Sequence, residues 1–187
     1  MFKIINKNQI ETHNKKYINN LKKDYDFFIR KVSRLKININ NIKNELMNFN
    51  IAIPSWGVGT GGTRFGKFPL KGEPNNIFEK IEDCAIINDL IGITKSISLH
   101  FPWDNVKDYK ELREFTKNYG LEFDAVNSNT FEDLDNYKHS YKFGSLTHTN
   151  KNVRDEAIKL NIDCIKKGIK LGSKALTVWI PDGTNYP

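Results

Sequence analysis

From residue 50 onward, short apolar segments alternate with amphipathic ones, and this alternation most constrains the fold. The expected strands cover residues 50–54, 95–101, 121–127 and 174–180. The expected helices between them cover about 76–91, 107–119 and, after a cap at Thr149 or Asn150, the stretch to about Lys170. Asn76 with Glu79 three residues later resembles a capping box at the start of the first helix, and the last helix is expected to stop near Gly172. Strands separated by helices favour right-handed βαβ units. The pattern therefore predicts an α/β fold with four parallel strands in one sheet.

The first 49 residues follow a different pattern, with apolar residues repeating at spacings of three and four. This spacing predicts helices over about 7–34 and 39–49, and Asn38 is a candidate N-cap between them. The apolar stripe is compatible with a coiled-coil seam. We expect it to pack against the rest of the fold or against a partner subunit.

Length and charge narrow the possible functions. At 187 residues the chain suits one domain with a substantial core. The net charge of +7 suggests nucleic-acid binding, but the densest basic stretch, Lys15 to Lys36, is interrupted by Asp24, Asp26 and apolar residues. That arrangement is typical of a solvated helix face. No nucleic-acid-binding motif is present, so we expect no nucleic-acid partner.

The two cysteines and the hydropathy pattern indicate the compartment. Cys84 and Cys164 lie far apart on apolar stripes of expected helices, so we interpret both as small buried thiols. No apolar run approaches the length of about 18 residues that a membrane span requires. We therefore expect a cytoplasmic protein without a membrane partner.

A glycine-rich stretch, IAIPSWGVGTGGTRFGKFPLKGEP over residues 51–74, contains the pattern G-x-G-x-x-G at Gly57, Gly59 and Gly62. A dinucleotide-binding loop requires a helix to begin at the third glycine. Prolines and further glycines exclude a helix here until about residue 76, and the second strand ends in His100 rather than in an acidic residue. We therefore reject a nucleotide site. The aromatic side chains of this loop predict an apolar tip that covers a pocket.

The carboxyl ends of parallel strands carry the active sites of α/β proteins. The unusual residues of this sequence fall there: Trp56, His100, Trp103, Asn127, Asn129, Trp179 and Asp182. Aromatic rings beside histidine and asparagine suit a small polyol or sugar. His100 is the best candidate for acid–base chemistry or hydroxyl binding, with a purely structural role as the alternative. We expect no metal site, because only Asp104 and Asp182 follow neighbouring strands and both lie in loops.

Several ordered strings carry a resemblance to a known family. They are IPSWGVGTGGTRF, NIFEKIEDCA, SLHFPWD, FDAVNSNTF, SYKFGSLTHT and LGSKALTVWIPDG. From about residue 10 onward the chain resembles the bacterial L-rhamnose isomerases of the Pseudomonas type, which are xylose-isomerase-like TIM barrels. The resemblance divides the chain into an N-terminal helical extension, residues 1–49, and the first half of a (β/α)8 barrel, residues 50–187.

The resemblance also implies a chemistry and an assembly. Family members are metal-dependent aldose–ketose isomerases, with Mn²⁺ the expected metal, and they are usually tetramers. The resemblance places His100 at the substrate and makes Trp56, Phe131 and Trp179 apolar walls of the pocket. It implies that Phe65 reaches a neighbouring subunit's active site and covers the sugar there.

The chain departs from this family in extent. The resemblance implies eight strands with the metal ligands on strands five to eight, and only four strands are predicted here. We expect the amino-terminal portion of an enzyme that converts L-rhamnose to L-rhamnulose, completed by a missing C-terminal half and inactive alone. The alternative is a non-catalytic remnant that self-associates or binds sugar weakly. In both cases the sheet would have unpaired edges.

Overall fold

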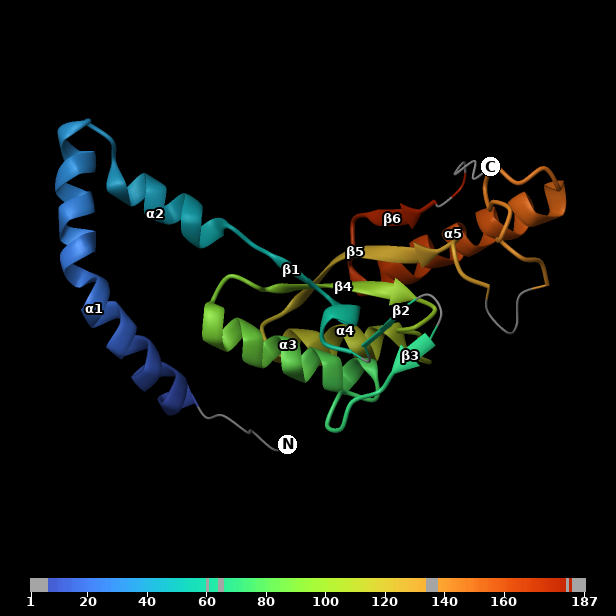
Figure 1. Ribbon diagram of the computed structural model, residues 1–187, viewed down its shortest axis with the longest axis horizontal. Coiled ribbons are helices and arrows are strands. Elements are labelled where there is room, and N and C mark those ends of the chain that lie inside the picture. Colours follow the sequence, from blue (N-terminus) through green and yellow to red (C-terminus); the bar gives the residue numbers. More distant parts are fainter. Residues whose placement is uncertain (1–6, 60, 64–65, 134–137, 181, 183–187) are drawn as a thin grey trace. The chain divides into compact units, whose positions relative to one another are not determined.

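The computed structural model of the chain describes residues 7–59, 61–63, 66–133, 138–180 and 182 (Figure 1). The chain divides into two compact units, which we describe separately. The first comprises Met1–Ile51 and Ile86–Thr94, and the second comprises Ala52–Ala85 and Lys95–Pro187. Within the described residues, no helix has both the length and the apolar character needed to cross a membrane.

The first unit contains the two predicted N-terminal helices, α1 (Lys7–Arg34) and α2 (Ile39–Asn48). Asn38 is the N-cap of α2, as predicted, because its side-chain oxygen accepts hydrogen bonds from the backbone N–H groups of Asn40 and Asn41. These bonds satisfy backbone donors that have no partner within the helix.

The second unit contains a four-stranded parallel sheet in the order β1-β4-β5-β6, which confirms the predicted α/β fold. Its strands are β1 (Ala52–Pro54), β4 (Ser96–Phe101), β5 (Glu122–Asn129) and β6 (Leu176–Trp179). The sheet is open, with β1 and β6 at its edges, and is consistent with part of a barrel.

Helices α3 (Ile77–Ile91), α4 (Tyr109–Asn118) and α5 (Lys151–Leu171) alternate with these strands (Figure 1). Asn76 caps α3 as predicted, since its side chain accepts from the N–H groups of Phe78 and Glu79. The Glu79 carboxylate accepts in turn from the backbone N–H of Asn75, one residue before the position that a capping box uses. Asp108 and Asn150 cap α4 and α5. Gly172 ends α5 with a φ of 83°, a left-handed conformation that glycine adopts without strain.

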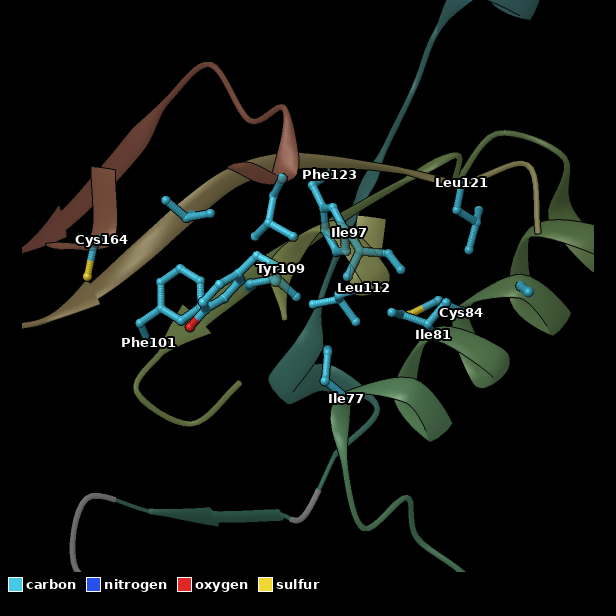
Figure 2. Packing of buried hydrophobic residues seen from close by; sticks show 14 residues of the cluster. Ile77, Ile81, Cys84, Ile97, Phe101, Tyr109, Leu112, Leu121, Phe123 and Cys164 are labelled. Carbon is cyan, nitrogen blue, oxygen red and sulfur yellow. The ribbon is translucent and has the colours of Figure 1, made fainter. Parts of the chain in front are cut away.

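An apolar core joins the sheet to its helices (Figure 2). Ile81, Ile97 and Leu112, from α3, β4 and α4, are fully buried within it. Cys84 and Cys164 are also fully buried, as predicted. Burial raises the pKa of the Cys84 thiol to about 12 and that of Cys164 to about 11, so both remain protonated at neutral pH.

The glycine-rich stretch between β1 and α3 forms no helix at its third glycine. It contains a one-turn 3-10 helix, Ser55–Gly57, followed by strands β2 (Gly61–Thr63) and β3 (Gly66–Phe68), which pair antiparallel. The sequence did not predict this hairpin. Gly59 allows a close approach, because a Cβ there would lie 2.7 Å from Cε of Lys80.

Candidate functional site

The second unit gathers aromatic side chains at the carboxyl ends of its strands. The residues are Trp56 after β1, His100 in β4, Trp103 after β4, Phe131 after β5 and Trp179 at the end of β6. Because parallel strands end at the same edge of a sheet, residues distant in sequence meet there. We call these five residues the aromatic cluster.

Four of the five predicted site residues belong to the aromatic cluster. The Trp56 ring lies 5.7 Å from the His100 ring and 6.4 Å from the Trp179 ring, measured between centroids and both edge-on. Phe131 lies 5.8 Å from His100 and 6.0 Å from Trp179. The structure therefore places Trp56, His100, Phe131 and Trp179 around one point. Phe65, the fifth predicted residue, lies outside the described residues.

Trp103 is a further member of the aromatic cluster, which the sequence analysis placed at the strand ends but did not include among the walls of the pocket. Its ring stacks on His100 at 3.8 Å between centroids, with 24° between the ring planes, and lies 6.4 Å from Phe131. Its position three residues after His100 in the string SLHFPWD was the available signal. Trp103 holds one face of the imidazole and stays 39% exposed.

His100 is the buried polar centre of the cluster, with only 2% of its surface exposed. Within the part of the chain that the structure describes, neither ring nitrogen has a hydrogen-bond partner. Burial lowers the pKa of His100 to about 4; the Asp104 carboxylate opposes this shift and the Lys80 ammonium adds to it. The imidazole is therefore neutral at pH 7, with one nitrogen able to donate and the other able to accept.

Asp104 joins two strand ends beneath the cluster. Its buried carboxylate accepts hydrogen bonds from the backbone N–H of His100 at 2.8 Å and from the hydroxyl of Ser55. Lys80, in α3, donates to the other carboxylate oxygen at 2.8 Å. Since Ser55 precedes Trp56, these bonds connect the β1 end to the β4 end. The sequence analysis considered Asp104 only as a metal ligand and missed this network.

Asn127 of β5 holds the β6 side of the cluster. Its side-chain N–H donates to the Leu99 carbonyl at 2.9 Å, and its oxygen accepts the indole N–H of Trp179 at 3.1 Å. Asn127 is buried, so both hydrogen bonds offset the cost of removing its amide from water. The amide thus links three neighbouring strands and orients the Trp179 ring.

Asp182, the other acidic candidate, performs a local structural role. Its carboxylate accepts hydrogen bonds from the backbone N–H and hydroxyl groups of both Ser145 and Thr147. Partial burial raises the pKa of Asp182, but these hydrogen bonds outweigh it and the net shift is downward. Among the described residues, no three His, Cys, Asp or Glu side chains gather to hold a metal ion. The described part of the chain therefore does not fit a metal site.

Fold and site define a parallel α/β protein that places a buried neutral histidine among aromatic rings at the strand ends, where such proteins bind ligands. Two curated proteins are similar to this chain in sequence. The chain is 52% identical over 167 residues to a probable sugar isomerase of Rhizobium meliloti, covering 89% of this chain and 39% of that protein. It is 49% identical over 184 residues to a probable sugar isomerase of Mesorhizobium japonicum, covering 98% and 43%.

At about 50% identity, this chain is a homologue of probable sugar isomerases. It spans about two fifths of the length of these curated relatives. No family model matches the chain.

Proposed function

We propose that this chain is the amino-terminal portion of a cytoplasmic aldose–ketose sugar isomerase of the L-rhamnose to L-rhamnulose type. In this proposal the chain supplies His100 and the aromatic walls of the sugar pocket, formed by Trp56, Phe131 and Trp179. Trp103 joins them because its ring stacks on His100.

The observation that carries the proposal is the state of His100. A polar side chain that is 98% buried and has no partner on either ring nitrogen, among the described residues, requires a compensating hydrogen bond. A sugar hydroxyl both donates and accepts, so it matches a neutral imidazole. The rings around His100 offer apolar faces to the C–H surfaces of a sugar. The similarity to probable sugar isomerases points to the same class of ligand.

The proposal assigns a divalent metal, Mn²⁺, to the complete enzyme and its ligands to the part that this chain does not span. The described residues provide no such ligand set, so we assign this chain only binding and positioning of the sugar. We further propose a homotetramer, with Phe65 of one subunit covering the sugar in another. Both of these statements rest on the family resemblance.

A second function belongs to a different class. A chain that spans only 39% and 43% of its relatives can be a non-catalytic remnant that self-associates or binds sugar weakly. The two functions differ in what happens when the rest of an isomerase is supplied, because only the first predicts turnover.

The test is complementation in a host that lacks its own L-rhamnose isomerase. The full chain would be co-expressed with the portion of the Rhizobium meliloti relative that it does not match. L-rhamnose conversion to L-rhamnulose would be measured with Mn²⁺ and with EDTA. We expect metal-dependent turnover that His100→Phe reduces at least tenfold, since a hydrogen bond made to a reacting sugar is worth roughly 1.4 kcal/mol or more.

His13→Phe is the matched control, because His13 lies in α1 and is exposed. It should leave turnover unchanged. A complex that copurifies but converts no aldose would contradict the first function and favour the remnant.

A further inference from the structure

A hollow of about 440 Å³ lies at the amino ends of β4 and β5, where α4 and α5 end. Its lining includes Lys95, directly before β4, and Glu122, the first residue of β5. Arg113 and Lys117 of α4 complete the charged part of the lining. The aromatic cluster lies at the carboxyl ends of the same strands, which the arrowheads mark in Figure 1. The hollow and the aromatic cluster are therefore on opposite edges of the sheet.

The lining of this hollow is positively charged, and we call it the basic hollow. Lys95, Arg113 and Lys117 carry three positive charges, and Glu122 carries one negative charge, so the excess is two positive charges. Lys117 also donates to Glu114 at 3.0 Å, but both side chains of that pair are exposed. An exposed pair of this kind is weak and opens readily for a stronger anion.

Arg113 occupies a special position in the basic hollow. Its half-buried guanidinium lies against the backbone of Gly172, where a Cβ would be 2.7 Å from one of its nitrogens and 2.9 Å from its Cζ. Only glycine permits this approach. Among the residues that the structure describes, none forms a hydrogen bond or an ion pair with this guanidinium. Its planar set of N–H donors is thus held in place and available to an oxyanion.

The carboxyl ends of α4 and α5 offer an alternative explanation for Arg113, because cations stabilise helix ends. The last carbonyls of both helices already have backbone partners, however. Those of Thr116 and Lys117 accept N–H groups at 2.8–3.2 Å, and those of Gly168 and Ile169 do so at 2.9–3.1 Å. Each helix end still contributes about half a negative charge. Against an excess of two positive charges, this leaves the basic hollow positive by roughly one unit.

We propose that the basic hollow is a binding site for a phosphate group. The Arg113 guanidinium donates two parallel hydrogen bonds to phosphate oxygens, and the ammonium groups of Lys95 and Lys117 supply further positive charge. The volume of about 440 Å³ falls within the range of small-molecule sites, roughly 300–1,000 Å³, so a small phosphorylated compound fits as well as inorganic phosphate. The site is separate from the proposed sugar pocket, and this inference does not depend on the proposed function.

The experiment titrates the full chain with inorganic phosphate at neutral pH and fixed ionic strength. Calorimetry gives the affinity, and the backbone amide NMR signals of Gly120 and Gly172, which line the basic hollow, report the location. Arg113→Gln should weaken phosphate binding at least about tenfold, because it removes a bidentate charged donor while keeping a good helix former. The control Arg30→Gln makes the same change at an exposed position of α1 and should leave the affinity unchanged.

Glu122→Gln tests the sign of the charge effect. This exposed carboxylate repels an anion in the basic hollow, so its removal should tighten phosphate binding about two- to fivefold. Opposite effects of the two lining variants cannot come from a shared loss of structure, and circular dichroism checks that both fold. No phosphate binding by the wild-type chain, glycine signals that do not move, or equal weakening by Arg30→Gln would each overturn the inference.

A further titration identifies the source of the phosphate group. Glucose 6-phosphate is compared with inorganic phosphate, and glucose without phosphate is the control. Tighter binding of glucose 6-phosphate at the basic hollow would identify an organic phosphate as the ligand, and equal binding would identify phosphate itself. Both results uphold the site. Glucose that moves the Gly120 and Gly172 signals as strongly as glucose 6-phosphate would show that the phosphate group is not recognised and would overturn the inference.

Discussion

Strands β4 and β6 both bring a residue to the aromatic cluster, but their surroundings differ. His100 at the end of β4 is buried, and its backbone is held by Asp104, which Ser55 and Lys80 also bind. Trp179 at the end of β6 is 46% exposed; its indole N–H donates to Asn127, and its backbone carbonyl accepts a hydrogen bond from the Thr130 hydroxyl. The chain completes the β4 side of the site by itself and leaves the β6 side open.

The β4 side is fixed by buried contacts, whereas the β6 side exposes apolar side chains to water. On the β4 side a buried charge network and an apolar core fix the positions of the side chains. On the β6 side apolar surface remains in contact with water at Ile180 and along one face of α5. That face carries the exposed side chains Ile158, Ile162, Ile165 and Ile169, which we call the isoleucine stripe. Substitutions on the two sides should therefore differ in cost even when the chemical change is the same.

The largest effect is expected at Asp104. Asp104→Ala leaves the Lys80 ammonium, 14% exposed, and the Ser55 hydroxyl without their acceptor. Removing one member of a buried pair lowers the free energy of unfolding by about 3–5 kcal/mol. Chemical denaturation monitored by circular dichroism measures it. Asp155→Ala, which breaks the exposed pair with Lys151, is the control and should change stability little. Equal midpoints for the two variants would contradict the network's role.

Next in size is an isoleucine-to-alanine comparison between the core and the stripe. Ile81→Ala opens a cavity at a fully buried position and should cost about 2–5 kcal/mol. Ile162→Ala removes a side chain that is 45% exposed, and alanine favours helix, so the change should stay within about 0.5 kcal/mol. Urea denaturation of the isolated chain measures both. A similar cost for Ile162→Ala would mean that the stripe is already covered in solution.

The sequence predicted the elements whose signals are local. Asn76 and Glu79, three residues apart, mark the start of α3, and Gly172 ends α5 at the predicted position. The parallel order followed from the alternation of strands and helices, and it explains why Trp56, His100, Phe131 and Trp179 meet. The rule that parallel strands end at one edge placed Trp56, His100 and Trp179 there, whereas Phe131 was named only through the family resemblance.

The remaining features depend on contacts that no local pattern encodes. The Asp104 network requires the ends of β1 and β4 to be adjacent and Lys80 to lie one turn into α3. The antiparallel strands β2 and β3 have three residues each and are rich in glycine, so they lack the alternation of apolar and polar residues that predicts a strand. The pKa of His100 depends on burial by Trp103 and other rings, which becomes visible only in three dimensions.

A smaller effect is expected from pH. The pKa of His100 is lowered to about 4 in the folded chain, against 6.5 as its ordinary value. Between these values the unfolded chain binds a proton that the folded chain does not, so stability falls as pH drops from about 6.5 to about 4. The His100 contribution to this loss is about 2–3 kcal/mol. Unfolding at several pH values should show it, and imidazole NMR signals report the pKa directly.

Carboxylates with lowered pKa, such as Asp108 and Asp182, make stability fall in the same direction, so a variant is needed to isolate His100. His100→Phe should remove the His100 contribution to the fall in the free energy of unfolding between pH 6.5 and 4. His13→Phe, at an exposed position in α1, should leave the slope intact. A His100 signal that titrates near 6.5 would show that the imidazole is open to water.

The smallest effect concerns the open side of the site. Trp179→Phe keeps an aromatic ring but removes the indole N–H that donates to Asn127. Because Trp179 is half exposed, we expect a loss of only about 0.5–1 kcal/mol. A double-mutant cycle with Asn127→Ala measures the coupling, which should be of similar size. Asn127→Ala alone should cost more, because it also leaves the Leu99 carbonyl without this donor. If the cycle gives no coupling in the isolated chain but gives it when the rest of an isomerase is present, Trp179 reaches its orientation only when the β6 side is covered.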